Sequence, residues 1–285
     1  MKNLIPIVVF CVFMYSCSRT PITGRSQLLL VSNQEVLALS LQQYNEYMST
    51  APISKDKANA DLVDRVGKNI AQAVAAYYEV SGMSEALSDF SWAFHLIADK
   101  QVNAFCMPGG KIVIYEGILP YTQNEAGLAI VVGHEVAHAI AKHANERMSQ
   151  QVAAQYGGAI VGGLLSKSSS TLQTLGNTVF GIGAQYGVML PYSRKQEYEA
   201  DRIGLILMAI AGYNPNVAAP FWERMSQQGA SVPEFMSTHP SDANRIKEIN
   251  KNLPEAMEYY RAVKGETPPK TTTPNNSKTS NEWKF

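Results

Sequence analysis

The chain has 285 residues, of which 46% are hydrophobic, so it can bury a sizeable core as one domain or as two modest ones. Lysine plus arginine balance aspartate plus glutamate at 24 each. Because no excess positive charge is left to hold a phosphate backbone, the composition argues against nucleic acid as a partner.

Residues 1–16 have the layout of a secretory signal peptide, in which a lysine precedes an apolar run that is short for a transmembrane helix. The small residue directly before Cys17 resembles the lipobox of bacterial lipoproteins. We therefore expect Cys17 to carry a lipid and residues 17–31 to form a tether. An ordinary cleaved signal with an incidental cysteine is the alternative. The serine after Cys17 resembles outer-membrane sorting and predicts a lipoprotein of the bacterial cell envelope, at the outer membrane and facing the periplasm.

Between the two ends, helical patterns surround two short β-type runs. The spacing of Ser32 and Glu35 is that of a capping box and marks the start of the first helix. The predicted elements, in chain order, are helices at 32–48 and 59–78, strands at 92–97 and 111–115, and helices at 124–155, 194–211, 215–227 and 241–252. They predict a helix-dominated α+β fold with a small β-sheet beside its central helix.

Three further segments complete the domain plan. We expect a single domain at residues 32–264 and a disordered tail at 265–285, which is too polar to offset its ordering entropy by burial. The glycine-rich segment 156–190 is either a mobile helical hairpin or lid, or a close-packed core hairpin. Cys106 has no partner for an intramolecular disulfide once Cys17 is acylated, and we expect it to be a small buried hydrophobic residue.

The sequence HEVAH lies inside the predicted helix 124–155 and carries the clearest chemical signal. His134 and His138 are four residues apart, so their rings leave the same helix face and can bind one ion. Glu135 beside them is placed to act as a general base on a water molecule. Apolar neighbours indicate a buried helix, where hydrogen-bonded core histidines are a weaker explanation than a divalent cation.

The third metal ligand must come from elsewhere. The extended motif H-E-x-x-H-x-x-G-x-x-H needs glycine and histidine at positions 141 and 144, and both are alanine. His143 is five residues past His138, so a continuous helix rotates it far from the ligand face, to the surface or to a supporting position.

The best candidate for the third ligand lies in the predicted helix 194–211. Glu197 and Asp201 are one turn apart on one face, the spacing of a ligand and its supporting carboxylate, whereas Glu199 points to the opposite side, towards solvent. A charged helix face with ion pairs four residues apart is the alternative. With Glu197 as the third ligand, the set is a two-histidine, one-glutamate zinc site with a fourth position open.

Taken in order, these features resemble the HtpX, BepA and CAAX prenyl protease family of zinc endopeptidases, a gluzincin group. The matching residues are the tether PITGRSQLLLVS, Asn103-Ala104-Phe105 before Pro108-Gly109-Gly110, HEVAH, the segment Ser193 to Asp201, and Thr238-His239-Pro240 with Arg245. The resemblance implies that His134, His138 and Glu197 bind one zinc ion and that Glu135 is the catalytic base. Membrane-embedded members have several transmembrane helices and the BepA type adds a helical repeat domain, and we expect neither here.

The resemblance also suggests where a substrate binds. The segment Asn103, Ala104 and Phe105 or the strand after it could take up an extended peptide as an added strand, or could simply form a hairpin at the edge of the sheet. His239 could donate to an oxyanion or occupy the open metal position at rest, and a structural loop histidine is the alternative.

The predicted function is that of a lipid-anchored zinc endopeptidase that degrades misfolded or misassembled cell-envelope proteins. The alternatives are a chaperone or assembly factor for outer-membrane proteins that uses the 156–190 segment, and a zinc hydrolase that is not a protease.

Overall fold

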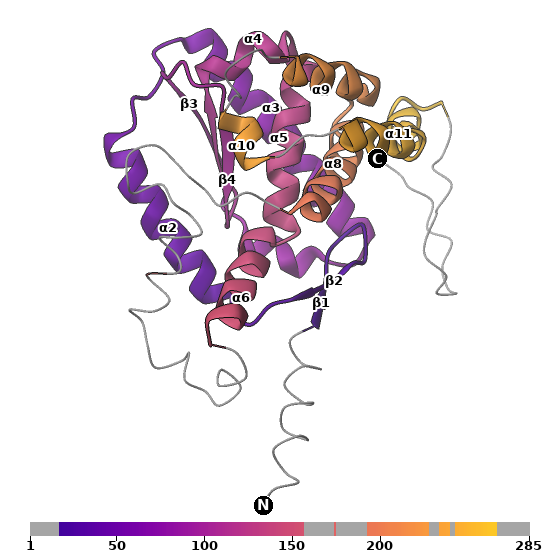
Figure 1. The fold of residues 1–285 in the computed structure, drawn as a ribbon. Helices are drawn as coiled ribbons and strands as arrows, with labels where there is room; N and C mark the ends of the chain where they lie inside the picture. Colours follow the sequence, from indigo (N-terminus) through magenta and orange to yellow (C-terminus); the bar gives the residue numbers. More distant parts are fainter. Residues whose placement is uncertain (1–16, 157–173, 175–192, 228–233, 240–242, 267–285) are drawn as a thin grey trace, which may run out of the picture.

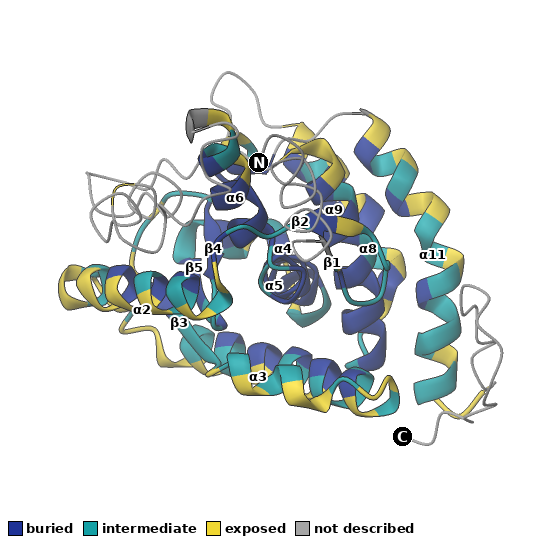
Figure 2. Ribbon diagram, turned by 90° about the horizontal axis from the view of Figure 1, so that it is seen from below, coloured by how far each residue is buried: buried dark blue, intermediate teal, exposed yellow. Residues whose placement is uncertain are grey.

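The fold is organised around helix α5 (Glu125–Ile140) in a computed structural model that describes residues 17–156, 174, 193–227, 234–239 and 243–266. The side chain of Asn124 caps this helix by accepting a hydrogen bond from the amide of Gly127. Almost every residue of α5 is buried, and in Figure 2 it is seen nearly end-on in the middle of the other elements. A helix that is apolar on all sides must lie in the core, and this one carries the HEVAH sequence.

A three-stranded sheet lies along one side of α5. Strands β3 (Ala93–Ile97) and β5 (Lys111–Tyr115) are parallel, and β4 (Ala104–Met107) pairs antiparallel with β5 at the sheet edge. Gly109 and Gly110 turn the chain between β4 and β5 with φ of 88° and 81°, which side chains disfavour. Both predicted strands are confirmed, and β4 contacts α5 (Figure 1).

The remaining helices cover this centre, with their exposed faces outward in Figure 2. The capping box of Ser32 and Glu35 is present at the start of the first of them. In chain order they are α2 (Asn33–Thr50), α3 (Lys57–Val80), α4 (Leu119–Thr122), α6 (His143–Tyr156), α8 (Arg194–Ile210), α9 (Ala218–Ser226), α10 (Glu234–Thr238) and α11 (Ala243–Val263). Short 3-10 helices lie at Ser84–Asp89, Glu116–Ile118 and Pro215–Val217. The predicted helix-dominated α+β fold is confirmed.

The single helix predicted over 124–155 is wrong, because the chain breaks between α5 and α6. Ala141 ends α5, and Lys142 takes a left-handed conformation with φ of 54°. No proline or glycine marks this position, so the sequence gives no conventional signal for a break. The turn redirects α6 and moves His143 away from the position that a continuous helix would give it.

Helices α5 and α8 cross at a pair of glycines. A Cβ atom on Gly204 would lie 3.0 Å from the carbonyl carbon of Gly133 and 3.0 Å from the amide nitrogen of His134. Real Cβ atoms rarely come this close to backbone, so glycine at 204 lets the two helices approach each other directly beside the HEVAH sequence. This contact brings Glu197, two turns earlier in α8, towards His134 and His138.

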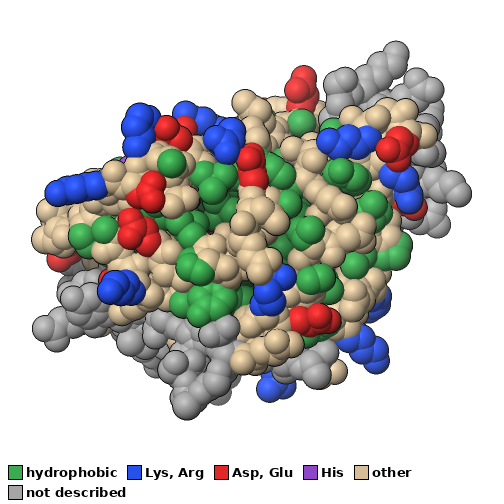
Figure 3. Space-filling view, turned by 90° about the horizontal axis from the view of Figure 1, so that it is seen from above, with side chains coloured by type: hydrophobic (Ala, Val, Ile, Leu, Met, Phe, Trp, Pro, Cys, Tyr) green, Lys and Arg blue, Asp and Glu red, His purple; other side chains and the backbone are tan. Residues whose placement is uncertain are grey.

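Several sequence predictions lie outside the described residues: the signal peptide at 1–16, nearly all of the glycine-rich segment 156–190, and the tail beyond 266. The domain boundaries therefore stay predictions. Among the described helices, none has the length and apolarity needed to cross a membrane. On the face seen in Figure 3, acidic and basic side chains are interspersed with hydrophobic ones, as the balanced composition leads one to expect.

Candidate metal centre

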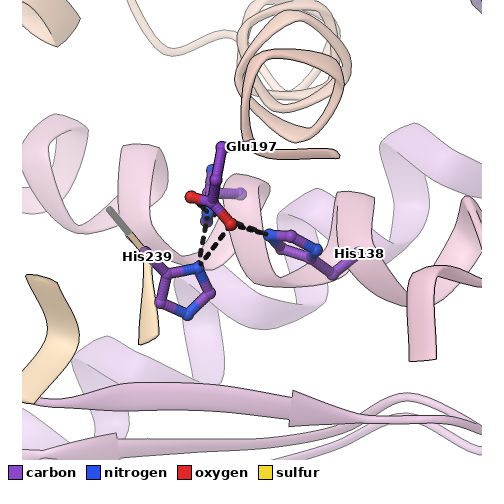
Figure 4. A group of neighbouring side chains, drawn as sticks. His138, Glu197 and His239 are labelled. Atoms are coloured by element: carbon purple, nitrogen blue, oxygen red, sulfur yellow. Dashed lines mark hydrogen bonds and ion pairs between the residues drawn. The ribbon is translucent and has the colours of Figure 1, made fainter. Parts of the chain in front are cut away.

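Four buried side chains converge at the crossing of α5 and α8. His134 and His138 come from α5, Glu197 comes from the first turn of α8, and His239 directly follows α10. Each is at most 2% exposed, and one potential ligand atom from each lies within 4.8 Å of the others. Figure 4 shows Glu197 between His138 and His239, with strands of the sheet below the site in this view.

The spacing of the donor atoms fits one tetrahedral ion. His134 Nε2 lies 3.1 Å from His138 Nε2 and 3.1 Å from His239 Nδ1. Glu197 Oε2 lies 3.4 Å from His134 Nε2, and Glu197 Oε1 lies 3.4 Å from His138 Nε2 and 3.2 Å from His239 Nδ1. Ligands held about 2.0–2.1 Å from zinc at tetrahedral angles are about 3.3 Å apart, so the observed separations are those of a zinc coordination shell.

Hydrogen bonding alone does not satisfy this cluster. Asp201 Oδ1 lies 2.9 Å from His134 Nδ1, and since an ionised carboxylate only accepts, this ring nitrogen carries the proton and Nε2 presents a lone pair to the cluster. Among the described residues, no hydrogen bond reaches the buried Glu197 Oε2, although the guanidinium of Arg245 forms an ion pair with it at 3.0 Å. Buried lone pairs that converge on one point are costly without a cation between them, so the residues present fit a zinc ion.

Arg245 supplies positive charge on the far side of Glu197 and Asp201. This fully buried guanidinium donates to Asp201 at 2.7 and 2.8 Å, lies 3.0 Å from Glu197 Oε2, and stacks 3.5 Å from the ring centroid of Trp222. Burial opposes ionisation of Glu197, but His239 and Arg245 hold the pKa of its carboxyl well below the usual range. Burial also opposes ionisation of Asp201, but the positive charge of Arg245 outweighs it and lowers the pKa of this carboxyl.

Glu135 lies next to this cluster, as expected of a base. Its Oε1 is 3.4 Å from His239 Nε2 and accepts no hydrogen bond from the part of the chain that the structure describes. Burial is the largest influence on this carboxyl and raises its pKa, while a hydrogen bond from the backbone amide of Cys106 in β4 lowers it. The glutamate is thus held against the edge strand with one oxygen available for proton transfer.

Two residues that helical rotation places away from the ligand face, His143 and Glu199, support the site from behind. His143 is fully buried, and its Nδ1 is 2.8 Å from Nδ1 of His138. Glu199 is 6% exposed rather than solvated, and it lies 3.0 Å from Nε2 of His143. The prediction for Glu199 is wrong because residues 17–28 cover that face of α8, and of the two positions offered for His143 it takes the supporting one because α5 ends before it.

Electrostatics keep the Glu199 and His143 pair in defined protonation states. Burial opposes ionisation of Glu199, but hydrogen bonds from His143, Thr23 and Thr20 lower its pKa to about 2. Burial lowers the pKa of His143, so its imidazole is neutral near pH 7. From the sequence, Arg245 was part of a matching motif but had no predicted role, and Trp222 was not predicted at all. No local pattern points to either residue.

The remaining predicted residues lie at the edge of the site. Asn103, Ala104 and Phe105 are buried in and just before β4, so the edge hairpin is present beside the metal cluster. Cys106 is buried and free, as predicted. Cys17 begins the short strand β1 (Cys17–Arg19), which pairs with β2 (Ser26–Leu28), and its lipidation stays a prediction.

Two histidines and a glutamate around a tetrahedral position, with a second glutamate beside them, define a zinc metallopeptidase centre. Residues 63–253 match Peptidase family M48, and the chain belongs to this family. At this level the predicted enzyme class, a zinc metalloendopeptidase, is confirmed, and so is zinc as the cofactor. The broader gluzincin resemblance is confirmed as well, but a specific HtpX or BepA type is not.

Three relatives illustrate what the chain is similar to. Mitochondrial metalloendopeptidase OMA1 of Schizosaccharomyces pombe is 42% identical over 182 residues, which cover 62% of this chain and 50% of the relative. OMA1 of Saccharomyces cerevisiae is 30% identical over 258 residues, covering 85% and 70%. The β-barrel assembly-enhancing protease of Yersinia pestis is 26% identical over 234 residues, covering 80% and 46%. The chain thus spans about half the length of the first and third of these relatives.

The predicted bacterial outer-membrane localisation is contradicted by these comparisons. The OMA1 relatives are mitochondrial, and they match at higher identity than the bacterial β-barrel assembly-enhancing protease. The physical reason for the error is that an apolar run and single residues on either side of Cys17 are short local patterns, which do not identify the membrane.

Proposed function

We propose that this chain is a zinc-dependent endopeptidase that cleaves misfolded or misassembled polypeptides at a membrane. The observation that carries the proposal is the buried set of His134, His138 and Glu197, whose donor atoms are 3.1–3.4 Å apart, with Glu135 beside it. A structural metal site needs no unsatisfied carboxylate at its side, whereas peptide hydrolysis needs a base there.

The residues have separable roles in hydrolysis. Zinc, when bound, supplies Lewis acidity that polarises the scissile carbonyl and acidifies water. Glu135 takes a proton from the attacking water at its available Oε1 and delivers it to the leaving amine. Asp201 fixes the tautomer of His134 by accepting from its Nδ1 at 2.9 Å. Arg245 holds Asp201 and Glu197 ionised and in place.

His239 is the fourth donor and stands where a substrate carbonyl must enter. Its Nδ1 is 3.1 Å from His134 Nε2 and 3.2 Å from Glu197 Oε1. We propose that this arrangement is a resting state and that His239 leaves the donor set when a peptide binds. The peptide then lies along β4, where Asn103, Ala104 and Phe105 lead to the edge next to Glu135.

The substrate class rests on the relatives. Their names describe metalloendopeptidases of mitochondria and a protease that enhances β-barrel assembly. The link of the second name to β-barrel assembly supports misassembled polypeptides as the proposed substrates. The chaperone or assembly function without proteolysis would have been favoured by a broken catalytic set, and the set here is intact.

Attachment to a membrane through a lipid on Cys17 is a separate proposal, independent of which membrane is involved. Cys17 starts a hairpin that packs on the catalytic domain, so a lipid there would hold the active site near the bilayer. Replacing Cys17 by Ser should move the protein from the membrane to the soluble fraction of cells and remove any acyl mass. An unchanged distribution would contradict the anchor.

The experiment for the catalytic function uses the purified full chain and casein as an unfolded substrate. We expect casein fragments that disappear with a zinc chelator and return when zinc is restored. Intact casein together with hydrolysis of small esters or amides would instead indicate a zinc hydrolase that is not a protease. Binding of unfolded chains without cleavage would indicate the chaperone function.

A further inference from the structure

Residues 17–28, here called the N-terminal hairpin, contact α6 and α8 through the tight turn between strands β1 and β2. The amide of Thr20 donates to the carbonyl of Arg25 at 2.9 Å, and the amide of Gly24 donates to the carbonyl of Thr20 at 3.0 Å. Gly24 has φ of 67°, a conformation suited to glycine. The turn directs three polar side chains at one buried carboxylate of α8, that of Glu199.

These contacts satisfy Glu199 from the hairpin side. The hydroxyl of Thr20 donates to Glu199 Oε1 at 2.7 Å, the hydroxyl of Thr23 donates to the same oxygen, and Arg25 Nε donates to Oε2. Arg25 also holds both oxygens of Glu146 on α6 through its terminal nitrogens, at 2.7 Å each. A surface tether needs none of these buried ionic contacts, which fix the hairpin to two helices that flank the metal ligands.

From Glu199, the hydrogen bonds continue to a metal ligand. Glu199 Oε2 lies 3.0 Å from Nε2 of His143, so this ring nitrogen must carry a proton, since the carboxylate only accepts. In a neutral His143, Nδ1 is then an acceptor, and it lies 2.8 Å from Nδ1 of His138. His138 must therefore be protonated at Nδ1, which leaves the lone pair of Nε2 directed at the metal cluster.

We propose that Glu199 and His143 are positioning residues for His138 and that the N-terminal hairpin is an integral part of the zinc site. This proposal rests on the proposed zinc function of the cluster. His134 receives the same support in one step from Asp201, whereas His138 receives it in two steps through His143. Outer partners of this kind set the tautomer and orientation of a ligand and strengthen metal binding.

The N-terminal hairpin extends the catalytic unit towards the start of the chain. The family match begins at residue 63, yet Thr20, Thr23 and Arg25 complete the support of a zinc ligand. The hairpin therefore couples the N-terminal end of the domain to the metal, so that displacing it loosens His138. Loss of an outer partner costs about 10-fold to 100-fold in metal affinity in comparable sites.

The test measures zinc affinity in the full chain by competition with a chromophoric chelator. We expect Glu199→Gln and Arg25→Gln to weaken zinc binding by about 10-fold to 100-fold. We also expect both variants to change the visible absorption spectrum of the cobalt-substituted protein. Matched controls are Glu255→Gln and Arg202→Gln. Each breaks a second arginine and carboxylate pair anchored on α8, with distances of 2.8 and 2.9 Å, whose members are outside the metal cluster. Both controls should bind zinc as wild type does.

A second measurement needs no variant. Nitrogen NMR of histidine-labelled, zinc-loaded wild type should show His143 protonated at Nε2 and His138 protonated at Nδ1. The opposite tautomer of His143, or wild-type zinc affinity in Glu199→Gln, would overturn the positioning role while leaving the zinc site intact. Failure of wild type itself to bind zinc would overturn the proposed function and this proposal with it.

Discussion

Replacing Arg245 by methionine tests whether the buried charges of the site are balanced as the structure indicates. Arg245 is fully buried and pairs with Asp201 at 2.7 and 2.8 Å and with Glu197 at 3.0 Å. Methionine fills similar space but leaves both carboxylates without their cation. Removing one partner of a buried ion pair costs about 3–5 kcal/mol, so the zinc-free protein should lose about that much unfolding free energy. For a domain of this size the melting temperature should fall by about 6–20 °C.

The same variant separates the metal from the arginine. Zinc bound to Glu197 supplies part of the missing positive charge, so the loss should be smaller in zinc-loaded protein than in chelator-treated protein. The assay is chemical denaturation of both forms followed by circular dichroism. The control Arg202→Met removes a half-buried pair with Glu255, for which a loss of about 0–1 kcal/mol is expected. A loss in Arg245→Met no larger than in this control would refute the reasoning.

Three further outcomes are expected. Gly204→Ala should lower the unfolding free energy by about 1–3 kcal/mol and weaken zinc binding, because the new Cβ would lie 3.0 Å from the backbone of Gly133 and His134. Unchanged zinc affinity would mean that the close contact of α5 and α8 is not needed for the site. Glu199→Gln should lower the unfolding free energy of zinc-free protein, and this loss should be complete above about pH 4.5. The loss should shrink as the pH falls towards 2, because the pKa of the carboxyl is about 2 in the native protein and 4.5 when unfolded. A loss that does not depend on pH would contradict this assignment. Zinc at about 100 times its dissociation constant should stabilise wild type by about 2.7 kcal/mol in thermal or chemical unfolding, and no shift on metal removal would contradict a folded-state site.

The sequence predicted the elements that carry strong local signals. The capping box at Ser32 and Glu35 starts α2 as expected, and the glycine pair before β5 makes the predicted turn. Of the second predicted helix, Val66, Ile70 and Val74 are fully buried. These features depend on residues close together in the chain, so periodicity and capping were sufficient.

The members of the metal cluster on α5 and α8 were also predictable, because HEVAH is local and Glu197 lies on a helix with regular spacing. Helical periodicity put Glu197 and Asp201 on one face of α8, and the structure places both at the cluster. HEVAH supplies two imidazole ligands, and a zinc site needs a third donor. This requirement led to Glu197, although it is distant in sequence.

The surrounding support was not predictable, because it depends on tertiary contacts. For His143 the sequence left open a surface or a supporting position, since nothing at Lys142 signals a left-handed residue. Glu199 was predicted to face solvent, since no pattern shows that residues 17–28 fold over α8. Arg245 likewise reaches the site only through the packing of α11 on α8. Each of these residues is polar, and each is buried only because a distant segment covers it.

The most direct test of the account is Glu135→Gln, assayed for casein cleavage and for zinc content. Glutamine keeps the size of the side chain but cannot take a proton, so cleavage should fall by about 100-fold to 10,000-fold while one zinc per chain is retained. Glu125→Gln, the same change at the half-buried start of α5, should cleave casein as wild type does. Full activity in Glu135→Gln would contradict the central claim that this glutamate is the base of a zinc endopeptidase.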